Sequence, residues 1–175
     1  MSMNFIKQFW RDTKGLALIE SALVLPLMIT LLFGLYDVGQ ALIINQKLKA
    51  ATYTASDLIT RKSYIDDDDI ANAVGGAYMV IDPYNRGRLG IDIAGIEFDE
   101  NDSPDVIWRY TDNMQPDGNI PSGADDLGNE GEGVVAVSTE YAYTPLFSSL
   151  FTGDITMREI SFMRGRRTSR VQYTD

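Results

Sequence analysis

The 175-residue sequence predicts an α+β protein, in which one long N-terminal helix carries a head made of a second helix and a roughly four-stranded antiparallel sheet. Three observations lead to this prediction. A long apolar run lies near the N-terminus, a helical pattern of small apolar residues follows it, and the second half of the chain alternates with the period of β-strands. The head would contain about 100 residues, which is enough for one hydrophobic core.

The composition excludes several kinds of function. The chain has no Cys and no His, so disulfides, thiolate nucleophiles, imidazole bases and the usual zinc sites are ruled out. The net charge of −10 argues against nucleic-acid binding. Pairs of carboxylates remain, but every acidic chain offers such pairs. We therefore expect no enzyme and no cofactor.

The charge divides the chain into segments. Residues 1–15 form a basic leader, residues 63–163 hold 20 acidic residues and four arginines, and the tail 164–175 holds four arginines and one aspartate. Residues 16–36 are predicted as a transmembrane helix, 37–62 as its amphipathic extension and 63–163 as the head. The basic tail suits contact with acidic neighbours or lipid headgroups, and a disordered end explains it equally well.

Residues 16–36 are apolar on every helical face. These 21 residues would form a helix of about 31 Å, close to the ~30 Å thickness of the hydrocarbon layer. A buried core helix is the alternative, but the roughly 100 residues that follow are only weakly apolar, and a cleaved signal peptide would be shorter. Because basic residues precede the run, the positive-inside rule places the N-terminus in the cytoplasm and the head across the membrane.

Glu20 is an unusual residue for this apolar segment. A carboxylate there costs about 2.5 kcal/mol or more unless it is paired or reaches the interface. Two interpretations stay open: an interfacial glutamate, or one that pairs with the α-amino group that cleavage after Gly15 would create on Leu16. Pro26 and Gly34 are expected kink positions, although an ordinary transmembrane proline explains Pro26 as well.

At these residues the sequence resembles a known family. Lys14-Gly15, four apolar residues and Glu20 resemble the prepilin-peptidase site of type IV pilins. The wider stretch 11–62 is similar to the TadE-like pseudopilins of tight-adherence pili, with Pro26 and an Ala-rich run at matching places, and residues 133–167 resemble the family more sparsely.

The resemblance implies a pilin-like fold and a role. Prepilin peptidase would recognise Lys14 and Glu20 and cut between Gly15 and Leu16, and Glu20 would set the register of assembly. The protein would be a minor pseudopilin, a single-pass protein of the bacterial inner membrane with a periplasmic head, which can be extracted into a pilus. Its partners would be membrane lipid, other pilins and the inner-membrane pilus assembly machinery.

One residue departs from the family pattern and keeps an alternative open. Ser21 stands where the family usually has an aromatic residue after the glutamate. A TadG-like subgroup keeps the helix without necessarily being processed. The alternative is therefore an unprocessed membrane-anchored periplasmic scaffold or binding domain.

The extension 37–62 shows a stripe of mostly small apolar residues at helical spacing. We expect one helix from about Phe5 to Lys62, with the stripe packed on the sheet; a coiled coil with a partner helix is the alternative. A polar face is expected opposite, formed by Gln46, Lys49, Thr52, Thr54 and Ser56. The stripe consists of Ala41, Ile44, Leu48, Ala51, Ala55 and Leu58.

A second helix is predicted to begin at Asp66–Asp69, because acidic residues cap a helix N-terminus and complement its dipole. Asp82-Pro83 would end it. Gly75-Gly76 either weakens this helix or marks close packing on the long helix. Its inner face would hold Ile70, Ala73, Val74, Ala77, Tyr78 and Ile81.

Four strands follow. The first contains Ile91 and Ile93, and its apolar phase shifts at Ala94-Gly95, which predicts a bulge. Residues 106–110 and 135–143 form the next two strands, and residues 155–162 the fourth, with Ile160 and Phe162 expected in the core. The linker 111–132 is rich in Gly, Pro, Asp and Asn, and so long a loop is usually functional or disordered.

One segment resembles a weak calcium site. Asp99, Asn101, Ser103 and Asp105 offer oxygen ligands at alternate positions. Pro104 stands where a calcium loop has Gly, and no bidentate Glu follows at the required place. A solvated hairpin without metal is the default expectation.

Overall fold

The computed structural model describes residues 14–147 and 153–174, with side chains from residue 18 onward. Most of the basic leader and the expected helix start near Phe5 lie outside these residues. The elements are α2 (Lys14–Thr60), β1 (Tyr64–Ile65), α3 (Asp67–Ile81), the short 3-10 helix η1 (Arg86–Arg88), β2 (Leu89–Phe98), β3 (Pro104–Asp112), β4 (Gly133–Tyr143), β5 (Ile155–Met163) and β6 (Gln172–Tyr173).

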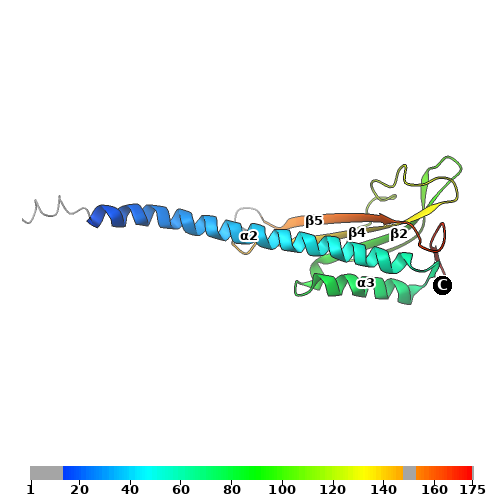
Figure 1. Cartoon of the computed structure of the whole chain (residues 1–175), viewed down its shortest axis with the longest axis horizontal. Helices are drawn as coiled ribbons and strands as arrows, with labels where there is room; N and C mark the ends of the chain where they lie inside the picture. The colour runs from blue at the N-terminus through cyan, green and yellow to red at the C-terminus, as the bar shows by residue number, and fades with distance from the viewer. Residues whose placement is uncertain (1–13, 148–152, 175) are drawn as a thin grey trace, which may run out of the picture.

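Helix α2 is one continuous element of 47 residues, which corresponds to about 70 Å. It runs without a break through Pro26 and Gly34. Its N-terminal half projects beyond the head as a bare rod, and its C-terminal half lies along the head (Figure 1). The predicted α+β fold, with a long apolar helix, a second helix and a four-stranded antiparallel sheet, is confirmed.

The sheet has the strand order β3-β2-β4-β5, and every neighbouring pair is antiparallel. Helix α2 lies along α3 and against β4 and β5. The loop 113–132 covers the opposite face through Ala124 and Leu127, which pack on Phe98 of β2. A separate parallel pair joins β1 to β6.

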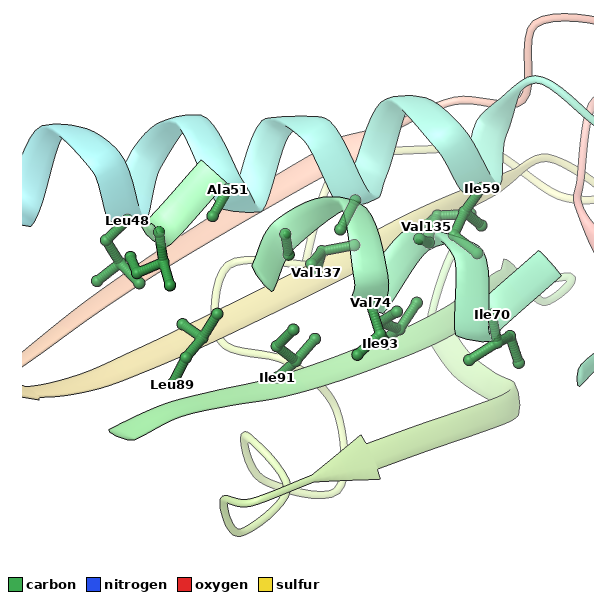
Figure 2. Packing of buried hydrophobic residues seen from close by; sticks show 14 of the residues in the cluster. Leu48, Ala51, Ile59, Ile70, Val74, Leu89, Ile91, Ile93, Val135 and Val137 are labelled. Atoms are coloured by element: carbon green, nitrogen blue, oxygen red, sulfur yellow. The ribbon is translucent and has the colours of Figure 1, made fainter. Parts of the chain in front are cut away.

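The main core lies between the two helices and the sheet. Side chains from α2, α3, β2 and β4 point toward one another there (Figure 2). Burying such aliphatic side chains contributes about 1.5–3 kcal/mol each before the entropy cost of folding. Figure 2 labels Leu48, Ala51, Ile59, Ile70, Val74, Leu89, Ile91, Ile93, Val135 and Val137.

Helix α3 begins and ends where the local signals predict. Asp66 is the N-cap, and its side chain accepts a hydrogen bond from the backbone nitrogen of Asp69 at 2.9 Å. The helix ends at Ile81, immediately before Asp82-Pro83. The predicted inner face is buried except for Tyr78, which is half-buried; its members are Ile70, Ala73, Val74, Ala77 and Ile81.

The predicted polar face of α2 is partly wrong. Thr52 and Ser56 are fully buried. The Thr52 hydroxyl donates to the carbonyl of Leu48 at 2.8 Å and lies 2.6 Å from the hydroxyl of Thr139 on β4. Because these short hydroxyl side chains bond to the preceding helical turn, they pack as small residues, and the buried stripe is wider than the apolar pattern predicts.

The phase shift in β2 has a different cause from the predicted one. Ile91 and Ile93 face the helices, whereas Ile96 and Phe98 belong to a second cluster beneath the loop 113–132. The side chains of the strand alternate normally along its whole length. The face that is buried against the helices at one end is replaced, at the other end, by the opposite face, which is buried beneath the loop. Since the loop provides its own apolar cover, the far end of the strand is buried on the outer face.

A bulge does occur at this point, but its extra residue lies in β3. Gly95 pairs with Trp108 and Ile96 with Val106, which leaves Ile107 as the additional residue. The bulge allows Trp108 to lie across Gly95: an added Cβ at Gly95 would come within 2.1 Å of the indole nitrogen. Only glycine leaves room for the ring here.

The expectation for the last strand is also corrected. Ile160 and Phe162 are only half-buried, and Ser161 between them is buried. Ser161 pairs with Val137, whose side chain belongs to the helix-facing core, while Phe162 packs on the second cluster of the outer face. The two apolar residues therefore face the outer side, away from the main core.

The basic tail folds onto the head. Val171 is 3 % exposed, and β6 follows it. Arg164, Arg166 and Arg170 form ion pairs with Glu132, Asp57 and Glu97 respectively. Of the two interpretations left open by the sequence, contact with acidic neighbours is the one observed, and those neighbours belong to the same chain.

Candidate functional site

The N-terminal half of α2 is apolar and has no cover from the rest of the described chain. None of its most apolar 18-residue window is buried. By length and composition, α2 is able to cross a membrane, and it is the one helix of the described residues that is. The exposed side chains include Leu18, Ile19, Leu23, Leu25, Leu27, Leu31, Leu32 and Leu35.

Glu20 lies on this bare surface near the start of the helix. It is exposed, and neighbouring apolar side chains, among them Val24 and Met28, flank it along the rod. Within the described part of the chain no hydrogen bond or ion pair to Glu20 is formed. The Gly15–Leu16 peptide bond, the predicted cleavage point, lies in the first turn of α2, as does Lys14.

The predicted packing stripe lies where α2 meets the head. Ile44, Leu48, Ala51 and Ala55 are each at most 2 % exposed, and Ala41 and Leu58 are partly buried at the edges. These residues pack on the head of their own chain. The stripe is therefore occupied within the chain, whereas the N-terminal half of α2 is exposed.

The junction between rod and head is held by a buried acid. Asp37 is 3 % exposed. Its carboxylate accepts hydrogen bonds from the backbone nitrogens of Leu146 and Phe147, both at 3.0 Å, and its carbonyl accepts one from the hydroxyl of Tyr143 at 3.1 Å. The segment that follows β4 is therefore fixed against α2 at the end of the apolar run.

Aromatic packing continues this contact along the rod. The rings of Phe33 and Phe147 stack at 4.0 Å with an interplanar angle of 5°, and Tyr36 meets Phe147 edge-on at 5.7 Å. We call the apolar group formed by Leu32, Phe33, Tyr36, Leu146 and Phe147 the collar. Leu146 remains 67 % exposed, so the collar presents apolar surface outward.

A groove of about 280 Å³ lies beside the collar, between α2 and the turn that precedes β2. Tyr36 and Leu146 line its rod side, and Tyr84 and Arg88 line its head side. The Tyr84 hydroxyl donates to Gln40 at 3.0 Å, and the Arg88 guanidinium donates to the carbonyl of Ala142 at 3.3 Å. The junction thus combines an apolar rim with a polar wall.

A second polar cluster lies on the outer face of the sheet. Arg109 forms two hydrogen bonds to the Asp92 carboxylate, at 2.8 and 2.6 Å, and Asp92 is 1 % exposed. These bonds raise the pKa of the Arg109 guanidinium above its usual value. Arg109 also donates to the carbonyl of Gly118, and the backbone nitrogen of Asp117 donates to Asp92. The cluster ties the loop 113–132 to the sheet.

The candidate calcium residues form the turn between β2 and β3. Asp99 Oδ1 accepts hydrogen bonds from the backbone nitrogens of Asn101 at 2.8 Å and Ser103 at 2.9 Å. These bonds, that of Ser103 first, lower the pKa of the Asp99 carboxyl. Asp105 is exposed at the start of β3. One of the two Asp99 carboxylate oxygens therefore serves to close the turn.

The comparison with protein families gave a match over most of helix α2. The model of the TadE-like protein family matches residues 15–57, so the suspected TadE-like character of the chain is confirmed over this stretch. The match contains Glu20 and Asp37 and most of the packing stripe, and it ends before the head begins. The family suggests a protein associated with tight-adherence pili. Comparison with curated proteins and with solved structures gave no significant match.

Sequence reasoning missed Asp37 and the collar. Asp37 only marked the end of the apolar run, and the segment before the fourth strand was noted for family resemblance alone. The sequence did contain a signal for the collar. The apolar pair Leu146-Phe147 follows Thr144-Pro145, just after the third predicted strand ends, where apolar residues indicate a further packing contact. Its partner on α2 could not be identified from spacing, because the contact joins distant parts of the chain.

Proposed function

We propose that the chain is a minor pseudopilin of a tight-adherence secretion system. It is anchored in the bacterial inner membrane by residues 16–36, with its N-terminus in the cytoplasm and its head in the periplasm. It acts by packing its apolar helix against the helices of other pilins, and this role requires no catalytic chemistry. The observation that supports the proposal is the apolar half of α2, which has no cover within the described chain and matches the TadE-like family.

Glu20 is the residue that makes this packing specific. An unpaired carboxylate in a membrane helix costs about 2.5 kcal/mol or more, and the described chain offers no partner for it. Prepilin peptidase would cut the Gly15–Leu16 bond and create an α-amino group on Leu16. In a bundle of helices with an axial offset, that amine of one subunit pairs with Glu20 of the next. A pair in a low-dielectric bundle penalises any other register.

The alternative is an unprocessed membrane-anchored scaffold, which Ser21 favours because it departs from the family pattern after the glutamate. Mass spectrometry of the protein purified from membranes separates the two. A mature form that begins at Leu16 supports the pseudopilin. A form that retains Lys14 and Gly15 in all molecules supports the scaffold and contradicts the proposed processing.

Substitution of Glu20 tests the assembly role. Glu20→Ala is expected to abolish piliation and leave membrane insertion unchanged, whereas the matched control Ser21→Ala is expected to assemble normally. Processing should be measured in the same cells. A variant that is processed but not assembled supports a register role, and one that is not processed indicates peptidase recognition. Normal piliation by Glu20→Ala would show that the proposed role of Glu20 is wrong.

A further inference from the structure

We propose that the collar inserts into the interfacial layer of the lipid bilayer and thereby seats the head directly on the membrane surface. This inference rests on the proposed membrane anchoring of α2. It adds a second lipid contact, from the connection after β4, that the transmembrane helix alone would not provide. The residues that reach lipid are Leu146 and Phe147, together with Phe33 and Tyr36 on α2.

The position of the collar along the rod supports lipid as its partner. A helix that enters the hydrocarbon layer at residue 16 leaves it after about 20 residues, that is, near Tyr36. Aromatic side chains are enriched at this depth, because their rings suit the boundary between acyl chains and headgroups. Phe33 and Tyr36 lie at this boundary, and Phe147 stacks on Phe33 at 4.0 Å. Phe147 therefore reaches the same depth as the end of the span.

The collar is also continuous with the surface already assigned to lipid. Leu32 is 65 % exposed, and Leu146, which belongs to the same apolar group, is 67 % exposed. A single exposed leucine on a soluble surface needs no explanation, but here Leu146 and Phe147 of the head extend the apolar surface formed by Leu32, Phe33 and Tyr36 of the rod. Asp37 fixes Leu146 and Phe147 in place through two backbone hydrogen bonds, so ordering these two residues on the membrane costs little additional entropy.

The distribution of charge on the head also supports contact of this end with lipid. Helix α3 runs antiparallel to α2, because Lys62 pairs with Asp69 at 2.6 Å at one end and Lys47 donates to the carbonyl of Val80 at 2.9 Å toward the other. The acidic start of α3 is therefore distant from the membrane, and η1 lies at the near end. Arg86 of η1 pairs with Asp82 there, so Arg88, which donates to the Ala142 carbonyl, is the basic residue of η1 that has no ion pair among the described residues. Anionic lipid headgroups attract basic residues and repel acidic ones.

The chain has no cysteine, so single-cysteine variants can be spin-labelled without background. The full chain is placed in lipid nanodiscs of phosphatidylethanolamine and phosphatidylglycerol, one copy per disc. Accessibility of the label to oxygen and to a water-soluble nickel complex is then measured. The test position is Leu146→Cys; the two references are Leu25→Cys in the middle of the span and Tyr64→Cys at the far end of the head, 57 % and 61 % exposed. All three positions are exposed, so labelling leaves the core intact.

The expected result is that the label at residue 146 loses access to the nickel complex and keeps access to oxygen, as at residue 25, while residue 64 is open to nickel. If residue 25 is protected and residue 146 is as open to nickel as residue 64, the inference is wrong and the membrane span stands. If residue 25 is itself open to nickel, the proposed anchoring fails, and the inference fails with it. Protection at residue 146 that appears only when several copies share a disc would assign the collar to a neighbouring pilin and overturn the lipid contact.

Discussion

The carboxylate of Asp37 lies 3.0 Å from the backbone nitrogen of Phe147, although 110 residues separate them in the sequence. This contact joins the end of the apolar run to the segment after β4. It fixes the head relative to the rod at a point where α2 itself continues without a hinge. A head attached in this way moves with its helix, so in the proposed assembly the register of the rods would determine the position of the heads.

Replacing Asp37 with Ala should release the segment after β4. The partly buried N–H groups of Leu146 and Phe147 would lose their charged acceptor, at a cost of about 1–3 kcal/mol in the free energy of unfolding. Hydrogen exchange on the full chain in detergent should show faster exchange at these two amides. Asp37→Asn retains one acceptor oxygen and should have a smaller effect. Asp125→Ala, at an exposed position, is the control. Equal exchange in all three variants would show that Asp37 does not hold the amides of Leu146 and Phe147.

The hydroxyls of Thr52 and Thr139 allow a sharper test of how α2 packs on β4. They lie 2.6 Å apart and both side chains are fully buried. Thr52→Val leaves the hydroxyl of Thr139 without this partner and should cost about 1–3 kcal/mol. The double variant with Thr139→Val removes both hydroxyls and should recover much of that loss. Denaturant unfolding of the two single variants and the double variant measures the coupling. Additive losses would show that the two hydroxyls do not interact.

These residues also show which parts of the fold the sequence could predict. The ends of α3 were predicted correctly, because the Asp66 cap and the Asp82-Pro83 stop act within a few residues of themselves. Thr52 was assigned to the wrong face, because hydrogen bonding to the Leu48 carbonyl satisfies its hydroxyl within the helix. A hydrophobicity pattern treats every hydroxyl side chain as polar and therefore does not predict that such a side chain can be buried when its hydroxyl bonds to its own helix.

The junction was not predictable for a different reason. Glu20 could be singled out because a charge in an apolar helix is costly wherever the rest of the chain lies. The role of Asp37 depends on the backbone of Leu146 and Phe147, which is distant in the sequence. Only the order of the strands in the sheet brings this segment close to α2. Periodicity identifies β4, but nothing local shows that its end returns to α2 beside Tyr36.

The alkaline pH dependence of stability should reveal the buried environment of Tyr78. Burial, together with the 2.7 Å hydrogen bond to Asp112, raises the pKa of Tyr78 to about 12. A tyrosine in the unfolded chain titrates near pH 10. The folded state therefore holds this proton longer. The resulting stabilisation is fully present below about pH 10 and is lost as the pH rises through 10 toward 12.

Tyr78→Phe removes this titrating group, so the free energy of unfolding of the variant should fall less as the pH rises. Denaturant unfolding of the full chain at about pH 9 and about pH 11 measures it. The wild-type chain should lose more stability than the variant between the two values. The same loss in both proteins would show that Tyr78 titrates normally in the folded state.

The paired glycines of α3 provide a matched test of how closely α3 approaches α2. A Cβ added at Gly75 meets no atom within 4 Å, whereas one at Gly76 would lie 2.8 Å from Leu58 Cδ1 and 3.4 Å from Thr54 Cγ2. Both glycines weaken the helix, so replacement by Ala gains up to about 1 kcal/mol from helix propensity at either position. Only Gly76→Ala must also displace the Leu58 side chain.

Gly75→Ala should therefore raise the free energy of unfolding by up to about 1 kcal/mol, and Gly76→Ala should gain less or lose. Thermal unfolding of both variants of the full chain measures the difference. The two substitutions are the same, lie in the same helix and differ only in what faces the new methyl group. A lower value for Gly76→Ala thus reports the contact with Leu58 directly. An equal gain at the two positions would show that the Leu58 side chain makes room at no measurable cost, and that Gly76 is not needed for the approach of the two helices.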